Sequence, residues 1–169
     1  MACEIACAGG VTREMEMEYE TTGNGGVTVK IKSPPAAFWS AIRNSTVMFP
    51  IAIPDLYISI IPNPKNLKER QVKYGPRSPN IKSSTEEITA NTEEVFIYRV
   101  TGGDIPFKYH VHDFKAIISY PIMPHVSWAW TYKHSPHDQS SASKLNADMA
   151  AIAKQTLEEL DNFLLIKST

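Results

Sequence analysis

Two histidines with one residue between them are the side chains best suited to chemistry in this sequence. His110 and His112 lie in a stretch that alternates like a β-strand, so both would point to one face, roughly 6 to 7 Å apart. One imidazole could accept a proton while the other polarises a carbonyl. An apolar cavity would depress both pKa values and keep a neutral base available at about pH 7. Exposed or purely structural histidines would show the same spacing, so both interpretations stay open.

A metal site has little support from these histidines. Asp113 follows His112 but would face the other side of the strand, and His125, His134 and His137 lie in or near expected loops. No spacing among them matches a zinc site or a site of two histidines and one carboxylate. We therefore expect neither a metal nor a cofactor.

Nucleophilic catalysis and phosphate binding are also disfavoured. The two cysteines, Cys3 and Cys7, lie within the first seven residues, and no serine occupies a Gly-x-Ser-x-Gly turn. Gly102 and Gly103 are typical of a turn between strands rather than a phosphate cradle, because no helix is expected after them.

Residues 1–10 are expected to form a mobile tail, followed by one domain over residues 11–169.

Aromatic side chains are the stronger indication of a ligand. Trp128, Trp130 and Tyr132 would share one face of a strand, which must be buried because exposed aromatics in a row would form an apolar patch. The same alternation places Phe96 and Tyr98 inside, and Tyr98 is a third candidate for proton transfer. Such walls offer flat apolar area with hydroxyl and indole donors, which suits a ring system. Ordinary core packing would explain the same residues equally well.

Further ligand contacts are predicted from the other elements. On the longest expected strand, alternation places both histidines on the same inward face as Phe114 and Tyr120. The complete set of additional predicted contacts is Phe38, Phe49, Tyr57, Tyr74, Phe114, Tyr120, Leu145, Met149, Ile152 and Thr156.

The first elements that would position these residues are a strand and two short helices. The strand is expected to begin at residue 12 and to be interrupted by a bulge or an inserted turn at residues 22–26. Ser33 precedes Pro34 and Pro35, a good helix start because the hydroxyl can cap and proline needs no donor in the first turn. Two later prolines, Pro50 and Pro54, keep the second helix short.

Six more strands and a long helix complete the predicted order. The strands are expected at residues 56–61, 69–74, 81–89, 94–100, 107–120 and 126–133, separated by Pro-, Gly- and Asn-rich turns. Short links without helices favour antiparallel pairing. Residues 140–167 change to helical periodicity, with Leu145, Met149, Ile152 and Thr156 on one side. The predicted class is α+β.

Several motifs in this order match a known family. They are Lys-Ser-Pro-Pro at 32–35, Phe-Trp at 38–39, Ile-Arg-Asn-Ser at 42–45, Met-Phe-Pro at 48–50, Lys-Tyr-Gly at 73–75 and Tyr-Arg-Val at 98–100. With them, the chain resembles the plant major latex protein branch of the birch-pollen-allergen superfamily (pathogenesis-related class 10, START-like). The resemblance implies a helix-grip fold, in which a seven-stranded antiparallel curved sheet surrounds a long C-terminal helix and encloses a cavity for hydrophobic ligands.

One expected family motif is replaced. Between the second and third strands the family usually carries a glycine-rich loop, whereas residues 62–68 read Pro-Asn-Pro-Lys-Asn-Leu-Lys. Without glycine and with two prolines, such a loop is not expected to bind phosphate-like groups or to flex as the family loop does.

Composition narrows the class of partner. With 17 basic and 18 acidic residues the formal net charge is −1, so nothing favours nucleic acid. No apolar run approaches the roughly 18 residues that a membrane span needs. The two N-terminal cysteines fit a reducing compartment, and we expect a cytoplasmic protein.

The resemblance leaves two functions open. The first is a cofactor-independent cyclase or isomerase of plant specialised metabolism, acting on a terpenoid, iridoid or alkaloid intermediate, with upstream pathway enzymes as further partners. The second is a non-catalytic carrier or receptor of a lipophilic hormone, flavonoid or steroid in defence. In both, the partner is a small hydrophobic metabolite that forms or carries rings, and fold alone does not decide between them.

Overall fold

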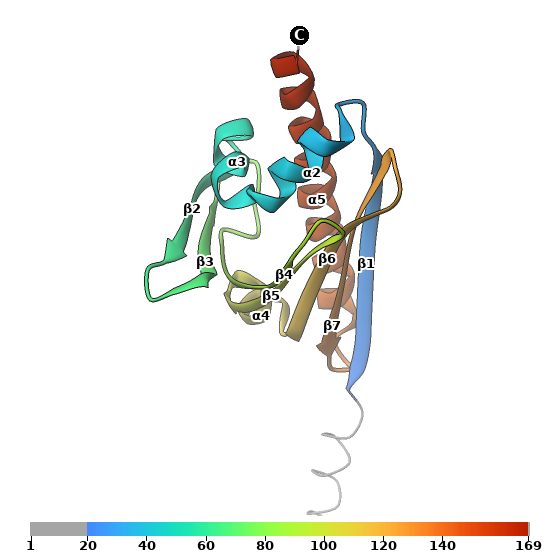
Figure 1. Cartoon of the computed structure of the whole chain (residues 1–169). Helices are drawn as coiled ribbons and strands as arrows, with labels where there is room; N and C mark the ends of the chain where they lie inside the picture. Colours follow the sequence, from blue (N-terminus) through green and yellow to red (C-terminus); the bar gives the residue numbers. More distant parts are fainter. Residues whose placement is uncertain (1–19, 169) are drawn as a thin grey trace, which may run out of the picture.

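Residues 20–168, the part that the computed structural model describes, form one antiparallel sheet with a long helix across it (Figure 1). The strands are β1 (Thr21–Lys30), β2 (Tyr57–Asn63), β3 (Asn66–Tyr74), β4 (Ser83–Asn91), β5 (Val95–Gly103), β6 (His112–Ile122) and β7 (His125–His134). The helices are α2 (Pro35–Arg43), α3 (Ser45–Ala52), α4 (Asp104–Tyr109) and α5 (Gln139–Ser168). The predicted tail and the predicted start of the first strand lie outside the described residues.

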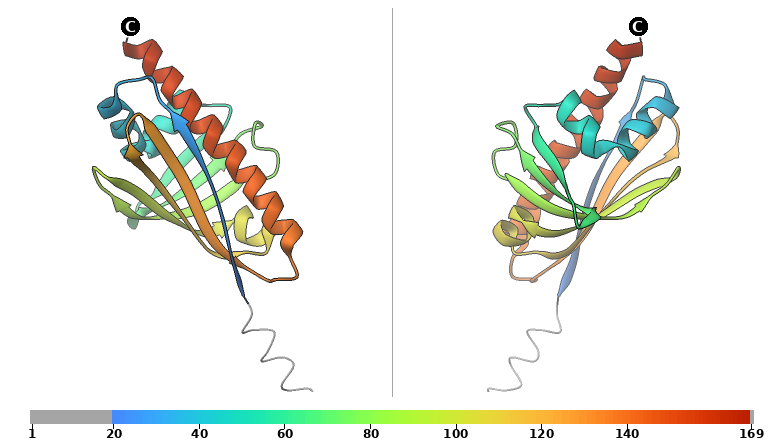
Figure 2. Two further views of the ribbon diagram at one scale, coloured as in Figure 1. Left: turned by 90° about the vertical axis from the view of Figure 1, so that its right-hand side faces the viewer. Right: turned by 60° about the vertical axis from the view of Figure 1, so that its left-hand side comes forward.

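The sheet has the order β1-β7-β6-β5-β4-β3-β2, with β1 and β2 at its edges. It curves around α5, while α2 and α3 close one end (Figure 2). This is the predicted helix-grip arrangement, and the antiparallel pairing, the two short helices after the first described strand and the long last helix are confirmed. None of the described helices is both long and apolar enough to cross a membrane.

The glycine-rich segment of β1 is regular strand, so the predicted bulge or inserted turn at residues 22–26 is wrong. β1 pairs with β7 residue for residue, from Thr21 opposite His134 to Lys30 opposite His125. A Cβ atom on Gly23 would lie 2.4 Å from the ring of Tyr132, and one on Gly25 would lie 2.6 Å from Nε1 of Trp130. The glycines therefore provide the space in which two large aromatic side chains pack against β1.

The start of α2 is only partly as predicted. Pro35 is the first helical residue, but Ser33 does not cap the helix. Its hydroxyl donates instead to Oδ1 of Asp161 at 2.6 Å, and the backbone N–H groups of Lys32 and Ser33 donate to the same carboxylate. Through these hydrogen bonds the buried Asp161 side chain of α5 holds the segment that connects β1 with α2.

A short helix, α4, replaces the first part of the strand predicted at 107–120. It follows Gly103, so the expectation that no helix follows the two glycines is also wrong. Pro106 lies in its first turn, where the missing N–H carries no penalty. His110 (φ 56°) and Asp113 (φ 54°) are both left-handed, and the register with β7 shifts between His112 and Lys115. These features change the phase of the side-chain alternation.

The segment at residues 62–68 is a tight hairpin rather than a long loop. β2 ends at Asn63 and β3 begins at Asn66, which pairs with it, so only Pro64 and Lys65 lie between the strands. The side chain of Asn63 accepts a hydrogen bond from the Lys65 N–H at 3.0 Å. Pro62 is tolerated because β2 is an edge strand.

Candidate functional site

A small cavity of about 10 Å³ lies in the interior between the sheet and the helices. That volume has room for about one water molecule, so the expected ligand-sized cavity is wrong in size. Strands β2 to β7 and helix α3 supply its lining, which consists of Phe49, Tyr57, Ile60, Arg70, Val72, Tyr74, Glu86, Tyr98, Ile118 and Trp128. Both apolar rings and ionisable side chains converge there.

A buried ion pair lies on one wall of this interior cavity. The side chains of Arg70 and Glu86 are each 4% exposed, and Nε and Nη2 of Arg70 lie 3.0 and 2.9 Å from Oε1 of Glu86. Nη1 of Arg70 donates to the hydroxyls of Ser45 and Thr46 at the start of α3, at 2.8 and 3.1 Å. Burial raises the pKa of Glu86, although Arg70 opposes this effect.

This ion pair was not predicted from the sequence. Arg70 shares its strand parity with Val72 and Tyr74, which was a usable signal that it points inward. Glu86 lies directly opposite it on β4, and that pairing follows only from the register of the two strands.

Three buried tyrosines surround the ion pair. The Tyr57 hydroxyl forms a 2.7 Å hydrogen bond with Oγ1 of Thr156, which in turn donates to the Ile152 carbonyl in α5. Burial raises the pKa of Tyr57, Tyr74 and Tyr98, and the negative charge of Glu86 adds to the effect. Their hydroxyls therefore remain protonated, and thus able to donate hydrogen bonds, at neutral pH.

Trp128 carries a buried donor that is not used. Its indole N–H has no hydrogen-bond acceptor among residues 20–168, although it lies near the Tyr98 hydroxyl, where it partly offsets the raised pKa of Tyr98. The other two indoles are satisfied, because Trp39 donates to the Thr92 carbonyl at 3.0 Å and Trp130 to the Asn146 side chain at 3.1 Å. Buried polar groups without partners are rare and call for an explanation.

The structure brings only part of the predicted ligand set to the interior cavity. Phe49, Tyr57, Tyr74, Tyr98 and Trp128 line it, and Thr156 joins through Tyr57. The other buried members are core residues that are not part of that lining, namely Phe38, Phe96, Phe114, Trp130, Tyr132, Leu145, Met149 and Ile152.

The histidines do not lie at the interior cavity, so their predicted inward position is wrong. The side chain of His110 is 70% exposed, 4.0 Å from Asp138, and that of His112 is 52% exposed. A hydrogen bond to Glu20 raises the pKa of His112, where an apolar cavity would have lowered it. His110 itself and Asp113 are left-handed, which breaks the alternation on which the prediction rested. No group of three or more possible metal ligands occurs within residues 20–168.

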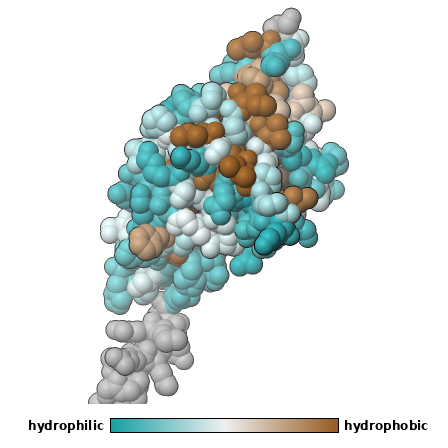
Figure 3. All heavy atoms as spheres, turned by 90° about the vertical axis from the view of Figure 1, so that its left-hand side faces the viewer, coloured by the Kyte–Doolittle hydropathy of each residue, from teal (hydrophilic) through white to brown (hydrophobic). Residues whose placement is uncertain are grey.

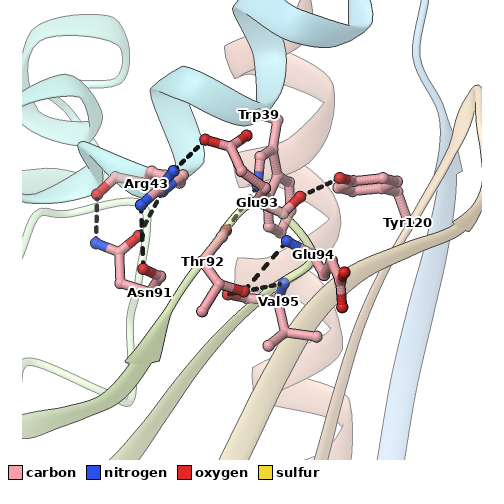
Figure 4. A network of polar contacts seen from close by, with 8 residues as sticks. All are labelled: Trp39, Arg43, Asn91, Thr92, Glu93, Glu94, Val95 and Tyr120. Atoms are coloured by element: carbon pink, nitrogen blue, oxygen red, sulfur yellow. Dashed lines mark hydrogen bonds and ion pairs between the residues drawn. The ribbon is translucent and has the colours of Figure 1, made fainter.

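Tyr120 belongs to a second, open hollow of about 720 Å³ between α2 and the turn that joins β4 to β5. Its ring packs edge-on against Trp39 at 4.7 Å, and its hydroxyl donates to the Glu93 carbonyl. Arg43 binds Asn91 and Glu93, so the polar groups here are occupied by one another (Figure 4). This surface groove lacks the unpaired buried donor of the interior cavity.

Comparisons with known proteins agree with this fold. No protein-family model matches the chain. The chain is 27% identical over 150 residues to MLP-like protein 423 of Arabidopsis thaliana, covering 82% of this chain and 92% of the relative. Norcoclaurine synthase of Thalictrum flavum, solved with dopamine and hydroxybenzaldehyde, superposes with a TM-score of 0.69 over 92% of each chain at 11% identity.

A second solved structure is ginseng major latex-like protein 151 from Panax ginseng. Its TM-score is 0.62 at 15% identity, over 81% of this chain and 96% of that one. At these identities the solved structures establish the fold, while the Arabidopsis relative matches across nearly its whole length. The chain therefore has the helix-grip fold of these solved structures, and along most of its length its sequence is similar to that of an MLP-like protein.

Proposed function

We propose that this protein binds a small, hydrophobic, ring-bearing metabolite at the interior cavity between the sheet and α5. The observation that carries the proposal is the convergence of aromatic walls, protonated tyrosines and an unpaired buried indole N–H on one interior point. Ligand sites are typically apolar surfaces with a few well-placed polar groups, which this arrangement provides. The similarity of the protein to its Arabidopsis relative and to the fold of norcoclaurine synthase supports a ligand-binding role.

A ring compound needs more room than about 10 Å³, and Phe49 is the side chain best placed to provide it. Phe49 is buried, and its ring lies 5.1 Å from that of Tyr57 and 6.4 Å from that of Trp128. If the ligand's ring takes the place of Phe49, the aromatic contacts of the cavity are exchanged rather than lost.

The helix that carries Phe49 is lightly held. α3 buries only Ser45 and Phe49 and contains Pro50, while Val47 and Ile51 are 51% and 57% exposed. Figure 3 shows apolar side chains gathered on the face of the molecule that bears α3 and β2. Because Arg70 fixes the start of α3, the proposed movement involves the end that carries Phe49.

The test is to trim Phe49 and measure binding of 2-acetylnaphthalene by calorimetry. Phe49→Leu and Phe49→Ala remove the cost of displacing the ring, so we expect affinity to rise by about tenfold or more. Phe49→Ala also costs about 3–5 kcal/mol of folding stability, which makes Phe49→Leu the safer variant. Val47→Ala, on the exposed face of the same helix, should leave affinity unchanged. Equal affinity in wild type and both Phe49 variants would count against an interior site.

A second candidate function is cyclisation or isomerisation of the bound metabolite without a cofactor. It is favoured by Glu86, a buried carboxylate with a raised pKa, and by Tyr98, a buried hydroxyl that lines the same cavity. Such groups can move a proton in a site that excludes water. Mass spectrometry of compounds retained from a plant extract, followed by turnover assays, separates a catalyst from a carrier.

A further inference from the structure

Two hydrogen-bond donors meet at the interior cavity, and one of them, the Trp128 indole N–H, has no acceptor among residues 20–168. Trp128 and Tyr98 are both 3% exposed, and their rings meet edge to face at 6.3 Å with an interplanar angle of 82°. The indole N–H of Trp128 has no acceptor of good hydrogen-bond geometry among residues 20–168, and the Tyr98 hydroxyl beside it is a second donor that lines the same cavity. Burying a donor without an acceptor costs free energy, so the hydrogen bonding of Trp128 is incomplete as it stands.

One oxygen atom would complete it. An sp² oxygen has two lone pairs and can accept from two donors at once. The cavity of about 10 Å³ that these side chains line is close to the space that one such atom needs. We propose that Trp128 and Tyr98 form a two-donor recognition point for a carbonyl oxygen carried by an apolar ring system. This inference rests on the proposed function.

The charges nearby disfavour an anionic ligand. Glu86 lines the same cavity, and a second carboxylate there would be repelled. The guanidinium of Arg70 already binds Glu86, Ser45 and Thr46, so it is not available to neutralise an acid. The Tyr57 hydroxyl is likewise taken by Thr156. The expected ligand class is therefore a ring ketone, aldehyde or ester, and carboxylic acids are disfavoured.

Three probes of nearly equal shape test this selection. They are 2-acetylnaphthalene, its isostere 2-isopropenylnaphthalene, in which a CH₂ group replaces the carbonyl oxygen, and the anion 2-naphthoate. Each neutral hydrogen bond is worth a factor of about three to ten in affinity, so wild type should prefer the ketone to the isostere by about 10- to 100-fold. The anion should bind more weakly than the ketone.

Two variants assign the preference to its donors. Trp128→Phe and Tyr98→Phe keep an aromatic ring and each remove one donor, so each should cut the preference for the ketone by about three- to tenfold. The double variant should abolish it, while binding of the isostere changes little. Trp39→Phe is the matched control, because its indole N–H is already bonded to the Thr92 carbonyl in the surface groove.

The outcomes separate this inference from the proposed function. If ketone and isostere bind wild type with equal affinity, ring binding stands and the two-donor site is wrong. If the preference for the ketone survives both Phe substitutions, the two-donor site is likewise wrong and ring binding stands. If no probe binds wild type or Phe49→Leu, both proposals fall. Should Trp128→Phe not fold, Tyr98→Phe and the probe series on wild type still give the answer.

Discussion

At the scale of the residue, His112 is held at the surface by two carboxylates. Its Nε2 lies 2.5 Å from Glu20 and its Nδ1 lies 3.3 Å from Asp113. The hydrogen bond to Glu20 is the main cause that raises the pKa of His112. We predict that NMR titration of His112 gives a midpoint above the ordinary value of about 6.5, and that Glu20→Gln moves it back towards that value.

The sign of the pH effect on folding stability follows from the pairing of His112 with Glu20. Because the pKa is raised on folding, the stabilisation is fully present below the unfolded pKa and is lost as pH rises through the folded pKa. It is small and weakened by salt, because both side chains are about half exposed. A His112 midpoint below the ordinary value would contradict this surface placement and restore the expectation of an apolar site.

At the scale of the element, β1 depends on two glycines that face β7 aromatics. Gly25→Ala would place a Cβ atom 2.6 Å from the Trp130 indole, and Gly23→Ala would place one 2.4 Å from the Tyr132 ring. Overpacking of this kind costs about 1–3 kcal/mol, which urea unfolding would measure as a lower midpoint. Gly26→Ala is the matched control, since the nearest atom is 3.3 Å away.

The result for Gly26 decides how the glycines are explained. If all three Ala variants lose equal stability, backbone flexibility of the strand rather than space for the aromatic rings is the reason for the glycines. The space explanation requires Gly26→Ala to be clearly more stable than the other two variants.

The elements were largely predictable from the sequence because their patterns are local. The alternation of Trp128, Trp130 and Tyr132 identified β7, and helical periodicity over residues 140–167 identified α5. The six residues of α4 are too few to show a period, and the two left-handed residues beside it alter the strand phase. That is why the inward position of the histidines could not be judged correctly.

Other features depend on which residues face each other across strands. A glycine run fits a bulge as well as a regular strand, and only the register that puts Trp130 opposite Gly25 decides. Similarly, Arg70 and Glu86 are of a type usually found at the surface, and their pairing follows from the β3–β4 register. The interior site was therefore predicted in its aromatic members but not in its charged ones.

At the scale of the whole molecule, the space between the sheet and α5 is filled differently on its two sides. Beside β1, Trp130 and Tyr132 occupy the interior and both donate to Asn146 of α5. On the side of β2 to β5, the interior keeps the small cavity that Phe49 helps to line. The proposed ligand position follows from this difference, because only there can a ring be exchanged without disturbing the β1 side.

The most direct test uses the three tryptophans as reporters of place. Trp39 reports on the surface groove, Trp130 on the β1 side of the core and Trp128 on the interior cavity. In a ¹H–¹⁵N NMR titration with 2-acetylnaphthalene, we predict a saturable downfield shift of the Trp128 indole N–H as it gains an acceptor, with little change at Trp39. A saturable shift at Trp39 with Trp128 unmoved would place the ligand in the surface groove and contradict the proposed interior site.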